Sequence, residues 1–295
     1  MTQTRTAFIA IVGCPNVGKS SILNRLLGQK VAVVSPKPQT TRTKIMGVLT
    51  EDEVQLVFTD TPGFHRPRTK LGEKMIKAVS DSISGVDACL FVVEPSGELR
   101  DAEKDLLKKF KDEKMPVILA INKIDSVKQK ELLIERMAQF SALYDFEAIV
   151  PCSALKGDGF GDLKDELFKQ AQPSPHFFPD DTLTDQPERV LAAEIIREKL
   201  LNLLDDEVPH GVAVCIERMH EREDSNITDI DATIYCERES HKGIIIGKKG
   251  EMLKKVSTKA REDMERFFMC KINLHCWVKV KEGWRNREGP VSYTH

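Results

Sequence analysis

Long hydrophobic runs are missing from this sequence of 295 residues, and no apolar stretch approaches the roughly 18 residues that span a membrane. Residues 1–6 are polar and form no signal-peptide core, and neither an internal repeat nor a low-complexity tract is evident. These absences argue against an integral membrane protein and a repeat protein, so we expect a soluble protein of the cytoplasm. A chain of this length predicts about two domains.

Cysteine motifs with metal-binding spacing are also missing. The seven cysteines are odd in number, mostly lie in apolar runs and include no C-x-x-C pair, which fits free thiols in a reducing compartment. Cys270, His275 and Cys276 surround one expected strand, but no fourth ligand is apparent, and zinc is therefore not expected. Cys14 lies near a predicted helix N-terminus, where a thiol pKa can fall, but we favour a tolerated variable position there.

The chain also lacks a strong overall charge of either sign. Its net charge of −2, taken alone, argues against a nucleic-acid partner. The charge is unevenly distributed, however, because residues 242–287 contain 13 basic and 5 acidic residues, whereas residues 180–239 contain 17 acidic and 6 basic ones. The C-terminal segment therefore offers a basic surface for phosphates. For Lys254, Lys255 and Lys259, both this role and that of a solvated helix face stay open.

What the sequence does contain is, first, a phosphate-binding motif near the N-terminus. The residues Gly13-Cys14-Pro15-Asn16-Val17-Gly18-Lys19-Ser20 match the pattern G-x-x-x-x-G-K-S and follow the apolar, strand-like run 8–12. In such a loop the backbone N–H groups and the start of the next helix, here including Ser21, surround a polyphosphate. Lys19 is placed to reach the β- and γ-phosphates, and the Ser20 hydroxyl is placed to bind Mg²⁺.

Two later segments predict that the nucleotide carries guanine. After the apolar run 117–121 comes Asn122-Lys123-Ile124-Asp125. The Asp125 carboxylate can accept two hydrogen bonds from the guanine ring N–H and amine, a donor pair that adenine lacks. Asn122 is expected to tie this loop to the phosphate loop, and the stem of Lys123 to cover one face of the base. After residues 148–150, Ser153-Ala154-Leu155 offers the Ala154 N–H to the guanine carbonyl.

The hydrolytic residues are expected in two segments between these motifs. Asp60-Thr61-Pro62-Gly63 follows the strand-like run 54–59. Asp60 is placed to hold Mg²⁺, and the Gly63 N–H to contact the γ-phosphate. Upstream, the polar, proline-punctuated stretch 35–42 suits a switch segment. One of Thr40 and Thr41 is expected to bind Mg²⁺ when the γ-phosphate is present, and we favour Thr41.

A last absence concerns the attacking water. Many small GTPases carry a water-orienting Gln directly after the D-x-x-G motif, but this sequence has Phe64, in the same nucleotide-contacting loop, followed by His65. Because a Phe side chain can neither orient nor deprotonate water, we expect slow intrinsic hydrolysis, supported by Lys19, Thr41 and Gly63. For His65, we favour a solvated side chain over a catalytic base.

The C-terminal third contains a second recognisable arrangement. Strand-like runs at residues 212–216 and 227–234 precede the loop Gly247-Lys248-Lys249-Gly250, and a helical stretch, 251–267, follows it. This is the arrangement of a KH domain, in which a G-x-x-G loop clamps the backbone of single-stranded RNA beside an apolar groove for the bases. The residues expected to contact RNA are Lys242, Gly243, Ile246, Gly247, Lys248, Lys249 and Gly250.

These motifs, in this order and spacing, resemble those of the Era and Der-type branch of translation-factor-related GTPases, and the KH-like third narrows the resemblance to the Era family. The resemblance covers nearly the whole chain and is weakest after Arg285. In that branch a hydrophobic residue replaces the catalytic Gln, as Phe64 does here. Members with Asn at the position of Asn16 are in several cases activated by K⁺. The resemblance therefore implies GTP or GDP with Mg²⁺, and K⁺ as an additional candidate.

The expected fold has two domains. Residues 1–172 are expected to form an α/β GTP-binding domain, a doubly wound P-loop fold with a mostly parallel six-stranded sheet and one antiparallel edge strand near residues 45–49. A proline-punctuated linker, 173–190, is expected to join it to an α+β KH domain of type II at residues 191–295.

The expected function is that of a GTP-hydrolysing switch that binds RNA. The resemblance implies that the RNA is the 3′ end of 16S rRNA and that the process is late assembly of the small (30S) ribosomal subunit. It also implies a monomer in the free state and, secondarily, peripheral association with the inner membrane. Two alternatives stay open: an RNA-binding chaperone in which the GTPase half only tethers, and a GTPase that signals to a protein or membrane partner. Intact Lys19, Ser20, Asp60 and Gly63 argue against the first. The loop 247–250 argues against the second.

Overall fold

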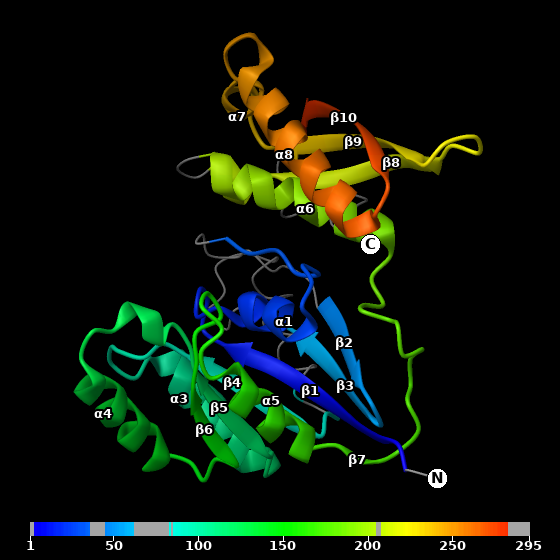
Figure 1. Ribbon diagram of the computed structural model, residues 1–295. Coiled ribbons are helices and arrows are strands. Elements are labelled where there is room, and N and C mark those ends of the chain that lie inside the picture. Colours follow the sequence, from blue (N-terminus) through cyan, green and yellow to red (C-terminus); the bar gives the residue numbers. More distant parts are fainter. Residues whose placement is uncertain (1–2, 36–44, 62–82, 84, 205–207, 283–295) are drawn as a thin grey trace. The chain divides into compact units, whose positions relative to one another are not determined.

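The computed structural model describes residues 3–35, 45–61, 83, 85–204 and 208–282 (Figure 1). Contacts divide the chain into two compact units. Apart from Ser35, the described residues up to Asp185 form the first unit, and those from Gln186 onward form the second. This division falls inside the stretch 173–190 that the sequence predicts as a linker. The predicted boundaries themselves, at residues 172 and 191, stay a prediction.

The first unit is built around one sheet, whose main strands are β1 (Arg5–Gly13), β2 (Ile45–Glu51), β3 (Val54–Asp60), β4 (Ala88–Val93), β5 (Val117–Ile121) and β6 (Ala148–Pro151). Their order is β2-β3-β1-β4-β5-β6, and every pair is parallel except β2 with β3. The six predicted strands, mostly parallel and with one antiparallel edge strand, are thereby confirmed. A further strand of two residues, β7 (Gln172–Pro173), which the sequence does not predict, pairs antiparallel with the start of β1.

Helices cover this sheet because its central strands are apolar on both faces. β4 and β5 are buried at every residue, the pattern of parallel strands between two helix layers. The described helices of this unit are α1 (Lys19–Leu27), α3 (Asp101–Glu113), α4 (Lys130–Ser141) and α5 (Phe160–Lys169), with the short 3₁₀ helix η1 (Ile124–Ser126). On β4, Phe91 packs edge to face against Phe110 and Phe140, with ring centroids 5.5 and 5.9 Å apart. The functional loops emerge at the carboxyl ends of the strands of this sheet.

Residues 174–184 are held against the first unit by hydrogen bonds to distant residues. The buried side-chain amide of Gln55 accepts hydrogen bonds from the N–H groups of Phe177 and Phe178 (2.8 and 3.0 Å) and donates one to the Phe178 carbonyl (2.9 Å). Farther along, the Val48 N–H donates to the Leu183 carbonyl (2.9 Å). The part of the predicted linker before residue 186 therefore packs as part of the first unit.

The second unit is an α+β domain. Its elements are α6 (Glu188–Leu203), β8 (Ala213–Glu221), β9 (Ile227–Cys236), α7 (Glu239–Ile246), α8 (Glu251–Phe268) and β10 (Lys271–Val280), with the 3₁₀ turns η2 (Val208–Gly211) and η3 (Lys248–Gly250). In its sheet, β9 lies between β10, which is parallel to it, and β8, which is antiparallel. The helices contribute apolar residues to one core with the sheet, among them Val256, Ala260 and Met264 on the buried side of α8. This order and pairing confirm the predicted type II KH fold.

Candidate functional site

The phosphate-loop motif forms the turn between β1, which ends at Gly13, and α1, which begins at Lys19. Both of its glycines leave no room for a side chain. A Cβ atom at Gly13 would lie 2.3 Å from the Val92 carbonyl oxygen, and one at Gly18 would lie 2.2 Å from Nδ2 of Asn122. Both glycines have positive φ angles, +151° and +98°, which glycine adopts without steric cost. The strand–loop–helix context that the motif requires is therefore present.

The Lys19 side chain folds back over this loop. Its Nζ atom donates hydrogen bonds to the carbonyl oxygens of Gly13 (3.2 Å) and Cys14 (3.0 Å), and the residue is only 6% exposed. Burial lowers the pKa of the Lys19 ammonium to about 8, although the nearby Asp60 carboxylate favours the charged form. A buried cation of this kind gains most from an anionic partner, such as a phosphate group in the loop.

Two of the predicted Mg²⁺ ligands come together from different elements. Ser20 lies in the first turn of α1 and Asp60 ends β3, and the Ser20 hydroxyl donates a 2.6 Å hydrogen bond to Oδ2 of Asp60. A hydroxyl and a carboxylate oxygen are the hard ligands that Mg²⁺ prefers, so this pair fits the ion. The Thr61 hydroxyl donates to the Ile11 carbonyl (2.8 Å), which holds the chain directly after Asp60 against β1.

Several residues assigned from the sequence lie outside the described part of the chain. They are Thr40, Thr41, Pro62, Gly63, Phe64 and His65. The roles assigned to them in Mg²⁺ binding, γ-phosphate contact and hydrolysis stay predictions.

The two base-recognition loops meet at the side chain of Asn122, which is 1% exposed. Its Nδ2 atom donates to the Val17 carbonyl in the phosphate loop (2.9 Å), and its Oδ1 atom accepts a hydrogen bond from the Ala154 N–H (3.0 Å). Asn122 thus ties its own loop both to the phosphate loop and to the loop after β6. The Ala154 N–H is predicted to meet the guanine carbonyl, but here it is engaged by Asn122. A bound base would therefore share or replace this contact.

Asp125 lies in η1, and its carboxylate is oriented by Ser153. The Ser153 hydroxyl donates a 2.5 Å hydrogen bond to Oδ1 of Asp125 and accepts one from the Lys156 N–H (3.1 Å). Leu155, which the sequence also assigns to this site, is 78% exposed. The residues after β6 therefore set the direction of the carboxylate that is predicted to recognise guanine.

A charged cluster lies beside the phosphate loop and joins Lys123 to two residues that the sequence motifs do not predict, Glu94 and Arg100. Lys123 Nζ donates to the Asn16 carbonyl (2.5 Å) and to Oε1 of Glu94 (2.8 Å), so its stem extends from the base loop to the phosphate loop. Glu94 also accepts a 2.5 Å hydrogen bond from Arg100. Burial opposes ionisation of Glu94, but the hydrogen bonds and charges of Lys123 and Arg100 hold the pKa of this carboxyl below its usual value. The one signal in the sequence is the position of Glu94 directly after the apolar run 88–93.

Cys14 is buried in the phosphate loop, with 2% of its surface exposed. Burial raises the pKa of its thiol, the charge of Glu103 adds to this rise, and Arg100 and Lys19 oppose it only in part. The lowered pKa considered for a cysteine near a helix N-terminus is therefore wrong. Cys14 is a neutral thiol near pH 7.

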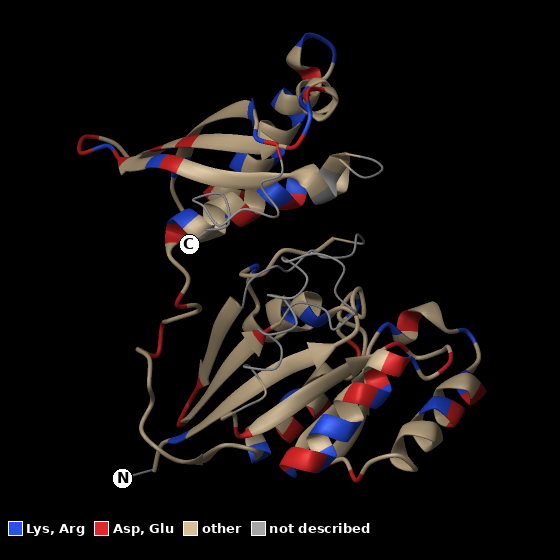
Figure 2. Cartoon of the chain, turned by 180° about the vertical axis from the view of Figure 1, so that it is seen from behind, with Lys and Arg blue, Asp and Glu red and all other residues tan. Residues whose placement is uncertain are grey.

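In the second unit, the loop 247–250 joins α7 to α8 and carries two exposed lysines, Lys248 and Lys249. A Cβ atom at Gly247 would lie 2.6 Å from Cβ of Met252, so the loop turns tightly against the start of α8. Figure 2 shows basic residues gathered at this turn. The loop therefore presents two ammonium groups to solvent beside the half-buried side chain of Ile246.

Three further lysines, Lys254, Lys255 and Lys259, are exposed on α8, on the side away from its buried apolar residues. A solvated helix face and a continuation of the basic loop both fit this placement. The alternatives that the sequence leaves for these lysines therefore stay open.

The loops of the first unit gather at one edge of its sheet. The phosphate loop, Asp60, Asn122 and Ser153 follow or end β1, β3, β5 and β6, and α/β sheets bind ligands at the carboxyl ends of their strands. Together these loops define a P-loop GTPase, to which the second unit adds a KH domain. A family model described as "50S ribosome-binding GTPase" matches residues 8–123, and one described as "KH domain" matches residues 207–285.

Relatives that are similar over nearly the whole chain identify the family within this class. The chain belongs to the Era family of GTPases. It is 48% identical over 288 residues to GTPase Era of Clostridioides difficile, covering 98% of this chain and 97% of the relative. It is 50% identical over 284 residues to GTPase Era of Ruminiclostridium cellulolyticum, covering 96% and 95%.

Two solved Era structures are similar over 96% of both chains, each at 38% identity. One is a variant of Aquifex aeolicus Era bound to GDP·AlF₄⁻, with a TM-score of 0.92. The other is Era in complex with MgGDPNP and nucleotides 1506–1542 of 16S ribosomal RNA, with a TM-score of 0.90. The GTPase activity and the two-domain fold predicted from the sequence are thereby confirmed.

GDP affinity is expected to fall as the pH rises above about 8, where free Lys19 loses its proton. Bound phosphates favour the ammonium form, so the pKa of Lys19 is higher in the complex than in the free protein. Well below pH 8 both states carry the proton, and the affinity does not depend on pH. Between the two pKa values binding takes up a proton, and affinity falls by up to about tenfold per pH unit.

Calorimetry at pH 7, 8 and 9, in buffers of different ionisation enthalpy, measures this proton uptake directly. The Lys19→Arg variant keeps its charge across the range and should bind GDP without proton uptake. An affinity that stays constant with pH, with no proton taken up, would show that Lys19 is not the titrating group.

Proposed function

We propose that the protein is a GTP-hydrolysing switch that binds the 3′ end of 16S rRNA during assembly of the small (30S) ribosomal subunit. The observation that carries this proposal is the loop 247–250, whose two exposed lysines stand on a KH fold in a chain that also holds a GTPase site. An Era that is 38% identical to this chain is in complex with nucleotides 1506–1542 of 16S ribosomal RNA. This complex supports the choice of RNA.

In this proposal the first unit binds GTP or GDP through the phosphate loop and the two base loops. Lys19 contacts the β- and γ-phosphates, the Gly63 N–H contacts the γ-phosphate, and Asp125 recognises the guanine. Mg²⁺ stabilises the phosphate charge when bound, and its protein ligands are Ser20, Asp60 and Thr41. The two solved Era structures contain GDP·AlF₄⁻ and MgGDPNP, which supports a guanine nucleotide and Mg²⁺ as the bound groups.

Slow intrinsic hydrolysis is part of the proposal because Phe64 occupies the position at which many GTPases orient water with Gln. Charge that develops between the phosphates must then be stabilised by cations, among them Lys19. We include K⁺ near Asn16 as a further cation. Turnover of GTP in potassium and in sodium, with and without the RNA, tests this part of the proposal.

A monomeric free state and peripheral association with the inner membrane are proposed from the family resemblance. The described residues include no helix that is both long enough and apolar enough to cross a membrane.

Replacing both loop lysines, Lys248→Asp together with Lys249→Asp, is expected to lower RNA affinity by at least about tenfold and to leave GTP binding unchanged. The change removes two phosphate contacts and adds two negative charges. The slope of log K against log salt concentration should therefore become shallower by about 1.4, the value for two contacts to a single strand. Fluorescence anisotropy with an RNA of the 1506–1542 sequence, at several salt concentrations, measures both quantities.

A matched control makes the same charge change in the first unit. Lys108→Asp together with Lys111→Asp alters two exposed lysines of α3 and should leave RNA affinity and its salt dependence unchanged. If the loop variant bound RNA as tightly as the unmodified protein, the KH loop would not be the RNA site. A protein or membrane partner for the second unit would then be favoured.

A further inference from the structure

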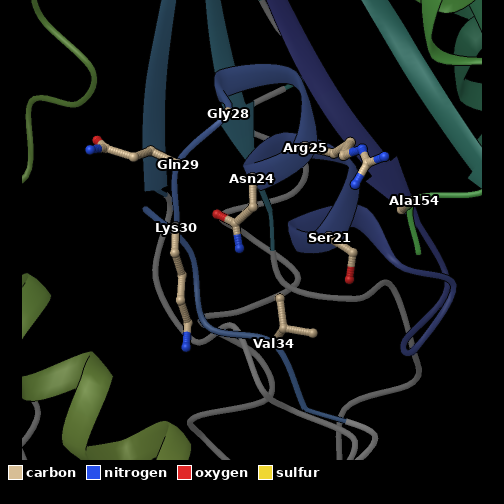
Figure 3. A pocket seen from close by; sticks show the side chains of 8 residues that line it. All are labelled: Ser21, Asn24, Arg25, Gly28, Gln29, Lys30, Val34 and Ala154. Carbon is tan, nitrogen blue, oxygen red and sulfur yellow. The ribbon is translucent and has the colours of Figure 1, made fainter. Parts of the chain in front are cut away.

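The outer side of α1 lines a pocket of about 580 Å³ that adjoins the nucleotide site, since Ser21 and Ala154 are among its lining residues (Figure 3). Arg25 extends from α1 toward the segment that carries Ala154. We propose that Arg25 is a positioning residue for guanine recognition, which holds the loop 153–159 in the shape that orients Asp125. This inference rests on the proposed role of Asp125 in binding the base.

Arg25 contacts the loop after β6 and the first residue of α5 in three ways. Its Nη2 atom donates a 3.0 Å hydrogen bond to the Lys156 carbonyl. Its guanidinium occupies the space beside Gly157, where a Cβ atom would lie 1.9 Å from Nη2 and 2.9 Å from Cζ. Its Cζ atom lies 6.0 Å from the centroid of the Phe160 ring, within the range of a cation–π interaction. Arg25 therefore links α1, the helix after the phosphate loop, to the loop after β6.

Lys156, whose carbonyl accepts the hydrogen bond from Arg25, belongs to a chain of hydrogen bonds that ends at Asp125. The Lys156 N–H donates to the Ser153 hydroxyl (3.1 Å), and this hydroxyl donates to Oδ1 of Asp125 (2.5 Å). The Gly157 N–H also donates to the Ser153 carbonyl (2.7 Å), which closes the turn on Ser153. A hydroxyl has one proton, so the bond from Lys156 leaves that proton directed at Asp125.

Loss of the Arg25 contact would therefore change the orientation of the Asp125 carboxylate relative to the base. Asp125 must present its oxygens to the ring N–H and to the exocyclic amine of guanine together, and the second bond is sensitive to rotation of the carboxylate. Hypoxanthine has the ring N–H but lacks the amine, so IDP reports the first bond without the second. The phosphate loop is tied to the base loops by Asn122 and Lys123, which Arg25→Ala leaves in place.

The test compares the dissociation constants of GDP and IDP, and the kcat and KM for GTP, in Arg25→Ala, Arg25→Lys and the unmodified protein. In Arg25→Ala, GDP affinity should fall by about two- to tenfold, while IDP affinity falls less, so that discrimination between the two bases decreases. KM should rise with little change in kcat, the pattern of a lost ground-state contact. Arg25→Lys should recover part of the discrimination because its ammonium can donate one hydrogen bond to the Lys156 carbonyl.

The matched control is Lys164→Ala. Lys164 is likewise a surface cation that joins two elements, because its Nζ lies 2.8 Å from Oε2 of Glu51 and 5.7 Å from the Phe168 ring centroid. Its removal should leave the ratio of GDP to IDP affinity unchanged. The inference is overturned if Arg25→Ala weakens GDP and IDP by the same factor or leaves both unchanged.

Asp125→Asn in the same assay separates the proposed role of Asp125 from the proposed role of Arg25. If this variant still prefers guanine, the proposed role of Asp125 is wrong and the role of Arg25 falls with it. If Asp125→Asn changes the base preference while Arg25→Ala leaves discrimination intact, only the inference about Arg25 is wrong.

Discussion

Replacing Asp125 by Asn is expected to lower GDP affinity by about 100-fold or more and to make XDP the preferred diphosphate. The carboxylate is predicted to accept charge-assisted hydrogen bonds from the guanine ring N–H and the exocyclic amine. In the amide of Asn, an NH₂ group replaces one of the two carboxylate oxygens, so only one of the two guanine donors still meets an acceptor oxygen. Xanthine carries a carbonyl in place of that amine, and the amide NH₂ group would find an acceptor there. Equilibrium competition between GDP and XDP checks this exchange of preference.

The hydrogen bond from Ser153 predicts how the introduced amide would lie. The Ser153 hydroxyl donates to Oδ1 of Asp125 at 2.5 Å, and an amide oxygen can accept this bond whereas an NH₂ group cannot. The oxygen therefore stays toward Ser153 and the NH₂ group faces the base. Asp158→Asn, the same change at an exposed position of the neighbouring loop, should keep the preference for GDP. A continued preference for GDP in Asp125→Asn would contradict the base-recognition role.

The parts of the site that could be predicted from the sequence are those in which consecutive residues carry the function. The phosphate loop needs glycine at Gly13 and Gly18 because of close approaches and positive φ angles, and such requirements leave a pattern in neighbouring positions. Asn122 and Asp125 likewise stand in one tetrapeptide after a buried strand. The strands and helices around these motifs have strong apolar periodicity, and for this reason the order of the main elements could also be predicted.

The parts that could not be predicted depend on contacts between residues far apart in the chain. Gln55 lies on a buried strand and bonds to Phe177 and Phe178, so a stretch that reads as a linker packs on the first unit as far as residue 185. Arg25 bonds to Lys156, 131 positions away. Neither Gln55 nor Arg25 belongs to a motif, and a single polar residue has no periodicity that reveals its partner.

The pKa of Cys14 could not be predicted for a related reason. The sequence shows a cysteine before a helix, where the helix dipole favours the thiolate. Burial raises the pKa of this thiol, and Glu103, on a helix that follows much later in the chain, raises it further. Both effects arise from packing in three dimensions, which local sequence does not contain.

Gly18→Ala is expected to lower the affinity for GTP and GDP by about 100-fold or more. The added Cβ atom would lie 2.2 Å from Nδ2 of Asn122, the atom that donates to the Val17 carbonyl at 2.9 Å. Asn122 is 1% exposed and also bonded to Ala154, so it cannot move aside without breaking one of these contacts. The phosphate loop must then shift directly before Lys19, so that its N–H groups and the Lys19 ammonium no longer match the phosphates. Each lost hydrogen bond to a charged phosphate costs about 1.5–3 kcal/mol. Calorimetry with GDP and GDPNP measures the loss.

Gly85→Ala separates this steric effect from backbone strain. Gly85 has a φ angle of +82°, and a Cβ atom there would meet no atom within 4 Å. The substitution therefore carries a comparable left-handed strain of about 1–2 kcal/mol without a clash, and it lies before β4, at the edge of the sheet opposite the phosphate loop. Both variants should lose thermal stability, but only Gly18→Ala should lose nucleotide affinity. If both lost affinity equally, strain in the first unit, and not the contact with Asn122, would account for the effect.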